Sequence, residues 1–194
     1  VKLRPVMNLK YKNPALLVID VQQGFEDEAY WGGNRNNKSA EKICGEILQK
    51  WRDYRLPIFH IRHSSLEPNS RLHPTHAGFA FHQCAMPKTH ETVITKHVNS
   101  AFIGTDLKQQ LDEQKISTLV IIGLTTNHCI STTTRMAGNY GYETYLISDA
   151  TATFDRVGVN GEKFDAELMH QTALASLNKE FATVLSTREL YERL

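Results

Sequence analysis

TLVIIGLTTNHCI, residues 118–130, joins the most apolar run of the chain to a polar segment that leads to a cysteine. Five consecutive β-branched or aliphatic residues, 118–122, are typical of a strand buried on both faces of a parallel sheet. The polar residues after Gly123 turn the chain out of the sheet, and Cys129 then begins a predicted helix. Because ligands bind beyond the carboxyl ends of strands in open α/β sheets, this stretch predicts an α/β fold with a thiol at its binding edge.

Short apolar runs like this one recur along the chain, with helical patterns between them. Such alternation builds a parallel sheet that helices cover on both faces. The predicted strands are residues 15–20, 57–63, 92–96, 117–123, 143–149 and 182–186. The first predicted helix, between the first two strands, has an apolar face of Ile43, Ile47, Leu48, Trp51 and Tyr54. We therefore expect a three-layer, Rossmann-like α/β fold, with residues 1–194 forming a single domain.

The bulk composition excludes several classes of protein. Twenty-two basic and 21 acidic residues leave a net charge of +1 without blocks of like charge, so we expect no nucleic-acid or membrane partner. Apolar runs of four or five residues are too short for a membrane span, and residues 1–14 lack the apolar core of a signal peptide. Three widely spaced cysteines indicate free thiols. These features predict a cytoplasmic protein.

One connection, residues 64–90, is too long for an ordinary loop. It contains three prolines and no helical or strand period, so it is predicted to cover a site as a lid or to form an oligomer contact; an irregular surface loop is the alternative. Six of the nine histidines fall in or just before this segment: His60, His63, His73, His76, His82 and His90. HPTH (73–76) could form a metal site, and solvated or capping histidines are the alternative. Because the spacing matches no zinc pattern, we expect no metal and no cofactor.

Three reactive side chains stand at or just beyond predicted strand ends. Asp20 ends the first strand, Lys96 ends the third, and Cys129 follows the fourth. A carboxylate at the end of a buried strand needs a partner, which Lys96 can provide. A thiol gains thiolate character from a helix N-terminus, a nearby cation or a base. Each residue alone has an ordinary structural explanation, but together they favour one catalytic site.

The motifs that carry these residues resemble a known family. ALLVIDVQQGF (15–25), VITKHVNSAFIGTDL (93–107) and the segment from Leu119 to Phe154 resemble the signature segments of the isochorismatase-like cysteine hydrolase superfamily. The resemblance implies a strand order of 3-2-1-4-5-6 and a catalytic triad of Asp20, Lys96 and Cys129. It also implies a cis peptide between Leu124 and Thr125, and an oxyanion hole formed by the N–H groups of Thr125 and Cys129.

Other positions have weaker assignments. Phe25 matches an aromatic position of the family and is predicted either to wall the pocket or to pack in the core. His128 stands beside the nucleophile and either orients substrate or lines the turn. The resemblance further implies assembly into a homo-oligomer. Nicotinamidase-type relatives carry a metal site with an aspartate after the second strand; residues 57–90 contain no aspartate, which argues against that activity.

Three functions remain open at this stage. The first is a cysteine-dependent hydrolase that cleaves an amide or similar C–N bond through a thioacyl-enzyme. The second is isochorismatase-type hydrolysis of a vinyl ether, with Asp20 as the general acid, and it predicts activity without Cys129. The third is a catalytically silent module that binds a metabolite. The presence of all three triad residues favours the enzymes, and the cysteine favours the amide hydrolase.

Overall fold

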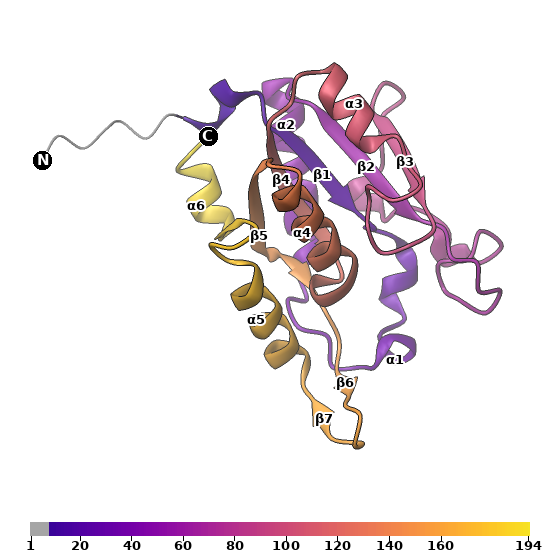
Figure 1. Ribbon diagram of the computed structural model, residues 1–194. Coiled ribbons are helices and arrows are strands. Elements are labelled where there is room, and N and C mark those ends of the chain that lie inside the picture. The colour runs from indigo at the N-terminus through magenta and orange to yellow at the C-terminus, as the bar shows by residue number, and fades with distance from the viewer. Residues whose placement is uncertain (1–7) are drawn as a thin grey trace, which may run out of the picture.

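The computed structural model describes residues 8–194, and a six-stranded parallel sheet forms its centre (Figure 1). The strands follow the order β3-β2-β1-β4-β5-β8, which confirms the expected order, with β8 as the sixth predicted strand. Their bounds are β1 (Ala15–Ile19), β2 (Ile58–His63), β3 (Thr92–Lys96), β4 (Thr118–Leu124), β5 (Glu143–Ala152) and β8 (Thr183–Leu185). A small hairpin of β6 (Arg156–Val157) and β7 (Lys163–Phe164) precedes the last helices and was not predicted.

Helices lie on both faces of the sheet and give the expected three layers. They are α1 (Glu28–Trp31), α2 (Ala40–Tyr54), α3 (Leu107–Glu113), α4 (Ser131–Asn139), α5 (Ala166–Leu177) and α6 (Thr187–Tyr191). The short helical turns are η1 (Leu9–Lys12), η2 (Gln23–Glu26), η3 (Ala77–Phe79), η4 (Gln83–Ala85) and the π-helical turn η5 (Thr126–Ile130). The expectations of a single domain over residues 1–194 and of no signal peptide extend to residues 1–7, which lie outside the described residues.

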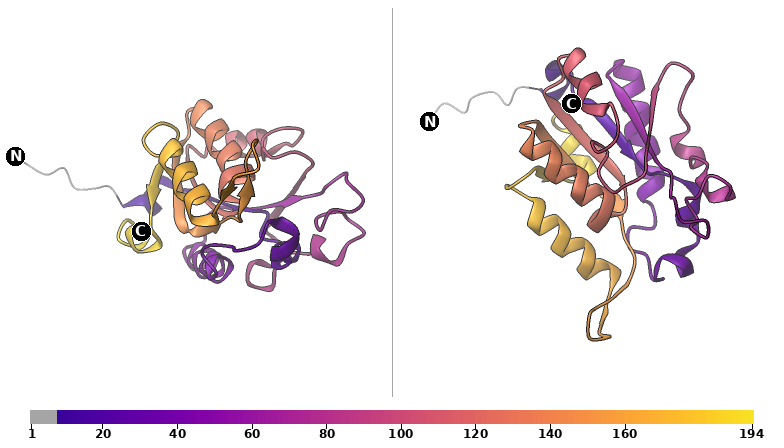
Figure 2. Two further views of the ribbon diagram at one scale, coloured as in Figure 1. Left: turned by 90° about the horizontal axis from the view of Figure 1, so that it is seen from below. Right: turned by 45° about the vertical axis from the view of Figure 1, so that its right-hand side comes forward.

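Two apolar clusters hold the layers together. One packs α2 and α6 against the sheet, and the other packs α3, α4 and α5 against the opposite face (Figure 2). β1 and β4 are buried along their whole length because they lie in the middle of the sheet between these clusters. This explains their unbroken apolar sequences. No helix within residues 8–194 combines the length and the apolar character that a membrane crossing requires.

Two local sequence signals differ from the structure. Ser39 stands at the N-cap of α2 but its side chain makes no cap hydrogen bond, and the Asn37 side chain donates to the carbonyl oxygens of Ser148 and Thr151. Leu168 is an apolar residue of α5, but it is exposed. The buried positions of α5 include His170, whose Nδ1 lies 2.8 Å from the Thr126 hydroxyl. A buried polar contact thus joins α5 to η5.

The long connection after β2 packs along the carboxyl end of the sheet. Phe81 forms an antiparallel bridge with Gln22, and the backbone N–H of Gln23 donates to Ala80 at 2.9 Å. Gln22 is fully buried, and its side-chain amide donates to the carbonyl oxygen of Phe79 at 2.9 Å. These contacts fix the segment over the end of β1. Its predicted role in oligomer contact stays a prediction.

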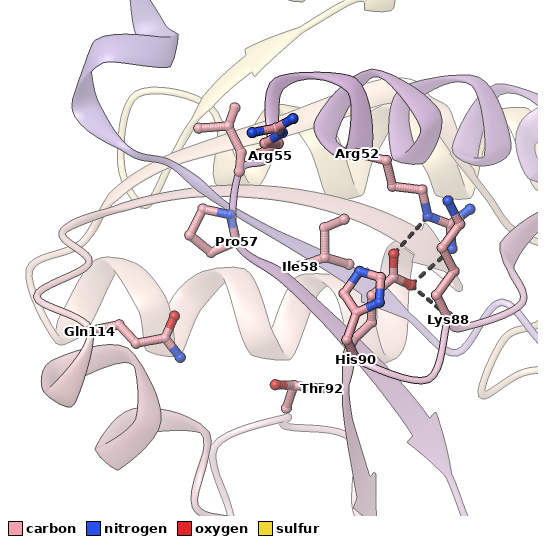
Figure 3. A pocket seen from close by; sticks show the side chains of 10 residues that line it. Arg52, Arg55, Pro57, Ile58, Lys88, His90, Thr92 and Gln114 are labelled. Carbon is pink, nitrogen blue, oxygen red and sulfur yellow. Dashed lines mark hydrogen bonds and ion pairs between the residues drawn. The ribbon is translucent and has the colours of Figure 1, made fainter.

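A cavity of about 440 Å³ opens at the opposite end of the strands, near the amino ends of β2 and β3 (Figure 3). Arg52 and Glu91 form an ion pair in its wall, with Arg52 Nε 2.7 Å from a carboxylate oxygen, and His60 Nε2 lies 2.8 Å from the other oxygen. Although burial raises the pKa of Glu91, Arg52, the Lys88 N–H and His60 outweigh it and lower that pKa to about 2. Glu91 therefore joins α2 to β2 as a carboxylate.

Glu91→Gln is expected to remove a pH-dependent contribution to the free energy of unfolding. Because the folded pKa of Glu91 lies below its ordinary value, the carboxylate contributes about 3 kcal/mol above pH 4.5, and this is lost as pH falls toward 2. Urea unfolding at pH 7, 4 and 3 should show the wild type and Glu91→Gln converging as the pH falls. Glu46→Gln changes an exposed residue of α2 and is the control. Its difference in unfolding free energy from the wild type should not shrink as the pH falls. A difference that is constant over this range would contradict the assignment.

Candidate active site

Asp20, Lys96 and Cys129 meet at the carboxyl ends of the strands. Asp20 follows β1 directly, with its N–H bonded to the carbonyl oxygen of Ile61 in the neighbouring strand at 2.8 Å. Lys96 ends β3, which is separated from β1 by β2, and its long side chain crosses the end of β2 to reach Asp20. Cys129 lies in the π-helical turn that follows β4. The topology thus brings together three residues that are distant in sequence.

The Lys96 ammonium is the centre of this cluster. Its Nζ lies 2.7 Å from Asp20 Oδ2 and 3.3 Å from Cys129 Sγ, and it donates to the carbonyl oxygen of Val98 at 3.2 Å. The side chains of Asp20 and Lys96 are fully buried. Asp20 Oδ1 is buried without a hydrogen-bond partner among the described residues, and a carboxylate oxygen of Asp20 lies within 4.8 Å of Cys129 Sγ. The carboxylate therefore retains a free acceptor beside the thiol.

The charges of the cluster differ from the expectation in one respect. Burial alone would lower the pKa of Lys96, but the neighbouring Asp20 and Cys129 raise it above its ordinary value, so Lys96 is an ammonium. Burial, followed by the charge of Asp20, raises the pKa of the Cys129 thiol far above its usual range, and Lys96 offsets only part of this. The expectation of a partly deprotonated thiol was therefore wrong: the free protein holds a neutral thiol beside a carboxylate.

The approach of β1 to β4 shapes the turn toward Cys129. Gly123 pairs with Ile19 and has a φ of +122°. A Cβ at this position would lie 1.9 Å from the carbonyl oxygen of Ile19, so only glycine fits. The peptide bond between Leu124 and Thr125 is cis. Asp20 also has a positive φ, +52°, in a region that aspartate tolerates better than most residues.

A cavity of about 190 Å³ opens onto Cys129. Four lining residues were singled out in the sequence: Phe25, Thr125, His128 and Cys129. The others are Trp31, His63, Ser65, Ser70, Leu72 and Asn99. Three of these belong to the segment 64–90, so that segment lines the cavity, and its predicted role as a lid stays a prediction. The larger cavity of Figure 3 contains none of the three central residues, and the smaller cavity is the candidate active site.

Aromatic rings form one wall of this cavity. The rings of Phe25 and Trp31 lie 4.7 Å apart, and Phe154 stacks behind both. Trp31 is fixed by its Nε1, which donates to the carbonyl oxygen of Gly24 at 2.8 Å. Burial and the nearby Arg156 lower the pKa of His128 on the same rim. A rigid aromatic wall and a neutral imidazole favour a small, flat ligand.

His63 is the residue that sequence reasoning missed. Asp20, His63 and Cys129 have ligand atoms within 4.8 Å of one another, the only such trio among residues 8–194. The Lys96 ammonium lies within 3.3 Å of all three, where a cation bound between them would sit. The HPTH histidines do not join this trio, since Nδ1 of His73 and of His76 bonds within its own turn. The expected lack of a metal stays a prediction.

Comparisons with known proteins identify the family of this chain. A family model described as the isochorismatase domain matches residues 14–189. The chain belongs to the isochorismatase family. This family member is 48% identical over 176 residues to the uncharacterized isochorismatase family protein YrdC of Bacillus subtilis, covering 91% of this chain and 93% of that protein. It is a hydrolase of the isochorismatase family, as its sequence had indicated.

Two further relatives of this isochorismatase-family hydrolase are a solved structure and a plant enzyme. The solved structure of a family member from Chromobacterium violaceum has a TM-score of 0.92 at 38% identity, and the match covers 98% of both chains. Nicotinamidase 3 of Arabidopsis thaliana is 28% identical over 199 residues, covering 94% of this chain and 89% of that protein. The fold of residues 8–194 is therefore that of the family.

Proposed function

We propose that this hydrolase cleaves an amide or similar C–N bond of a small molecule through a thioacyl-enzyme on Cys129. One observation carries the proposal: the Lys96 ammonium bridges Asp20 and Cys129, Asp20 Oδ1 has no hydrogen-bond partner among the described residues, and a carboxylate oxygen of Asp20 lies within 4.8 Å of the thiol sulfur. A buried carboxylate with a free lone pair is suited to accept a proton during nucleophilic attack. The similarity to a nicotinamidase, an enzyme named for an amide substrate, supports the same bond type.

Asp20 carries each proton that moves in the proposed reaction. As Cys129 Sγ attacks the carbonyl carbon, its proton passes to Asp20 Oδ1, and the N–H groups of Thr125 and Cys129 stabilise the oxyanion. Asp20 then gives the proton to the leaving nitrogen as the C–N bond breaks. Water attacks the thioester and loses a proton to Asp20, which returns it to the departing sulfur. Lys96 remains an ammonium and holds Asp20 in place.

Vinyl-ether hydrolysis is the competing activity of this site. It would use Asp20 as a general acid and would not need a thiol. An isochorismate-like acid carries carboxylates, yet no arginine or lysine is among the described residues that line the cavity. The cavity of about 190 Å³ is also small. Both features favour a small amide with little charge.

Intact-mass analysis of the enzyme during turnover tests the proposal. Small primary amides, added in excess and quenched with acid, should add the acyl mass to the wild type, and peptide mapping should place it on Cys129. Cys84→Ser is the matched control and should acylate normally, because Cys84 contacts the Glu41 carbonyl and His82 rather than the cavity. Hydrolysis of a vinyl ether that survives Cys129→Ala but not Asp20→Asn would replace the proposal with the competing activity.

A further inference from the structure

His63 occupies a position in the cavity that the proposed reaction does not use. It is the last residue of β2 and pairs in register with Lys96, the last residue of β3. Its Nδ1 lies 2.9 Å from Lys96 Nζ, and its ring lines the cavity above Cys129. The His63 imidazole therefore contacts Lys96 and also lines the cavity in which a substrate would bind.

The neighbouring ammonium sets the tautomer of His63. An ammonium group has three donors and no acceptor, so the Lys96 contact requires a lone pair on His63 Nδ1. A neutral imidazole with this lone pair carries its hydrogen on Nε2. Burial, followed by the charge of Lys96, lowers the pKa of His63, in agreement with a neutral ring. His63 is thus a hydrogen-bond donor through Nε2.

This donor is open to the cavity. Nε2 makes no hydrogen bond to residues 8–194, and it is not among the buried side-chain atoms that lack a partner. It is therefore reached by solvent, on a ring that lines the cavity. One ring nitrogen lies within 4.8 Å of Cys129 Sγ, which places the imidazole beside the thiol and beside a substrate that the thiol attacks.

Gln22 holds the end of β2 that carries His63. The Gln22 Oε1 accepts the backbone N–H of His63 at 2.9 Å, and its Nε2 donates to the His63 carbonyl oxygen at 3.1 Å. Because Gln22 is fully buried and also bonds the Phe79 carbonyl oxygen, this clamp leaves the backbone little freedom. The Nε2–H of His63 is consequently preorganised toward the cavity.

We infer that His63 is a specificity-determining residue that donates from Nε2 to an acceptor atom of the acyl group, next to the scissile carbonyl. The inference rests on the proposed amide hydrolysis. Phe25 and Trp31 supply an aromatic wall to the cavity, with their rings 4.7 Å apart and tilted by 33°. The substrate class is therefore a small aromatic or heteroaromatic carboxamide with an acceptor adjacent to the carbon that bears the amide, of which pyridine-2-carboxamide is a simple probe.

Nitrogen-15 NMR of histidine-labelled protein tests the tautomer without any substrate. The His63 signals, assigned with His63→Asn, should show a protonated Nε2 and an unprotonated Nδ1 at pH 7. Adding pyridine-2-carboxamide to Cys129→Ala should shift the Nε2 signal, and adding benzamide should not. A protonated Nδ1, or an imidazolium, would overturn the inference whatever the enzyme hydrolyses.

Binding of four matched amides tests the specificity. Benzamide and the three pyridine carboxamides differ only in the presence and position of one ring nitrogen, and calorimetry on Cys129→Ala separates binding from turnover. Pyridine-2-carboxamide should bind about tenfold more tightly than benzamide, the value of one hydrogen bond. Adding His63→Asn keeps an acceptor for Lys96 but removes the distal donor, so the preference should vanish. His63→Gln, whose amide nitrogen reaches the Nε2 position, should restore part of it.

The outcomes separate the inference from the proposed function. A structural role of His63 would weaken all four amides equally in His63→Asn, and this result would overturn the inference. Equal binding of the four amides, or no binding of any, would do the same even if the wild type hydrolyses other amides. If the preference and its loss are observed but no acyl-enzyme forms with any amide, the inference about His63 stands and the proposed function fails.

Discussion

Replacing Cys129 with alanine is expected to lower kcat for amide hydrolysis by at least about 10⁴-fold while the protein stays folded. In the proposed reaction the thiol forms the covalent bond, whereas Asp20 transfers protons and the Lys96 ammonium has no lone pair with which to attack. Cys129 is buried and small, and its contact with Lys96 is secondary to the Asp20 pair at 2.7 Å. The unfolding free energy should therefore change by only about 1 kcal/mol.

Single-turnover assays and urea unfolding of the same sample check both parts of this prediction. Cys84→Ser is the matched control, a half-buried cysteine outside the cavity, and should retain the wild-type kcat. Because the thiol of the free enzyme is neutral, alkylation of Cys129 should also be slow at pH 7. Full activity in Cys129→Ala would show that the thiol is not the nucleophile.

The proximity of Asp20, Lys96 and Cys129 could be predicted from the sequence because each follows a simple rule, and their catalytic roles stay predictions. Asp20 follows β1, Lys96 ends β3 and Cys129 follows β4, and parallel strands bring their carboxyl ends to one end of the sheet. His63 obeys the same rule as the last residue of β2. The sequence signal of His63 as a strand end is hidden because five other histidines lie nearby in the sequence.

Other features could not be predicted because they depend on tertiary contacts. Ser65, Ser70 and Leu72 reach the cavity on a loop that tertiary contacts hold, among them the bond from the buried Gln22 to the Phe79 carbonyl oxygen. No period in the sequence encodes such an anchor. The protonation of Cys129 is a similar case: the cation and helix that lower a thiol pKa were visible in the sequence, but the burial that outweighs them was not.

Lys96→Met is expected to destabilise the protein by about 3–5 kcal/mol at pH 7, the typical cost of removing one partner of a buried ion pair. Asp20 Oδ1 already lacks a partner, and this change would also remove the partner of Oδ2. A fully buried carboxylate without compensation takes up a proton rather than remain charged. The triad would then lose its proton acceptor, and hydrolysis should fall together with stability.

The pH dependence and a second substitution identify the cause of this loss. Because the folded pKa of Lys96 is raised, its contribution to stability is complete below about pH 10.4, the unfolded value, and is lost as pH rises through the folded pKa. This alkaline loss should be absent in Lys96→Met. Adding Asp20→Asn makes the pair neutral and should restore most of the unfolding free energy without restoring activity. If the double variant is no more stable than Lys96→Met, an unpaired Asp20 carboxylate is not the reason for the instability.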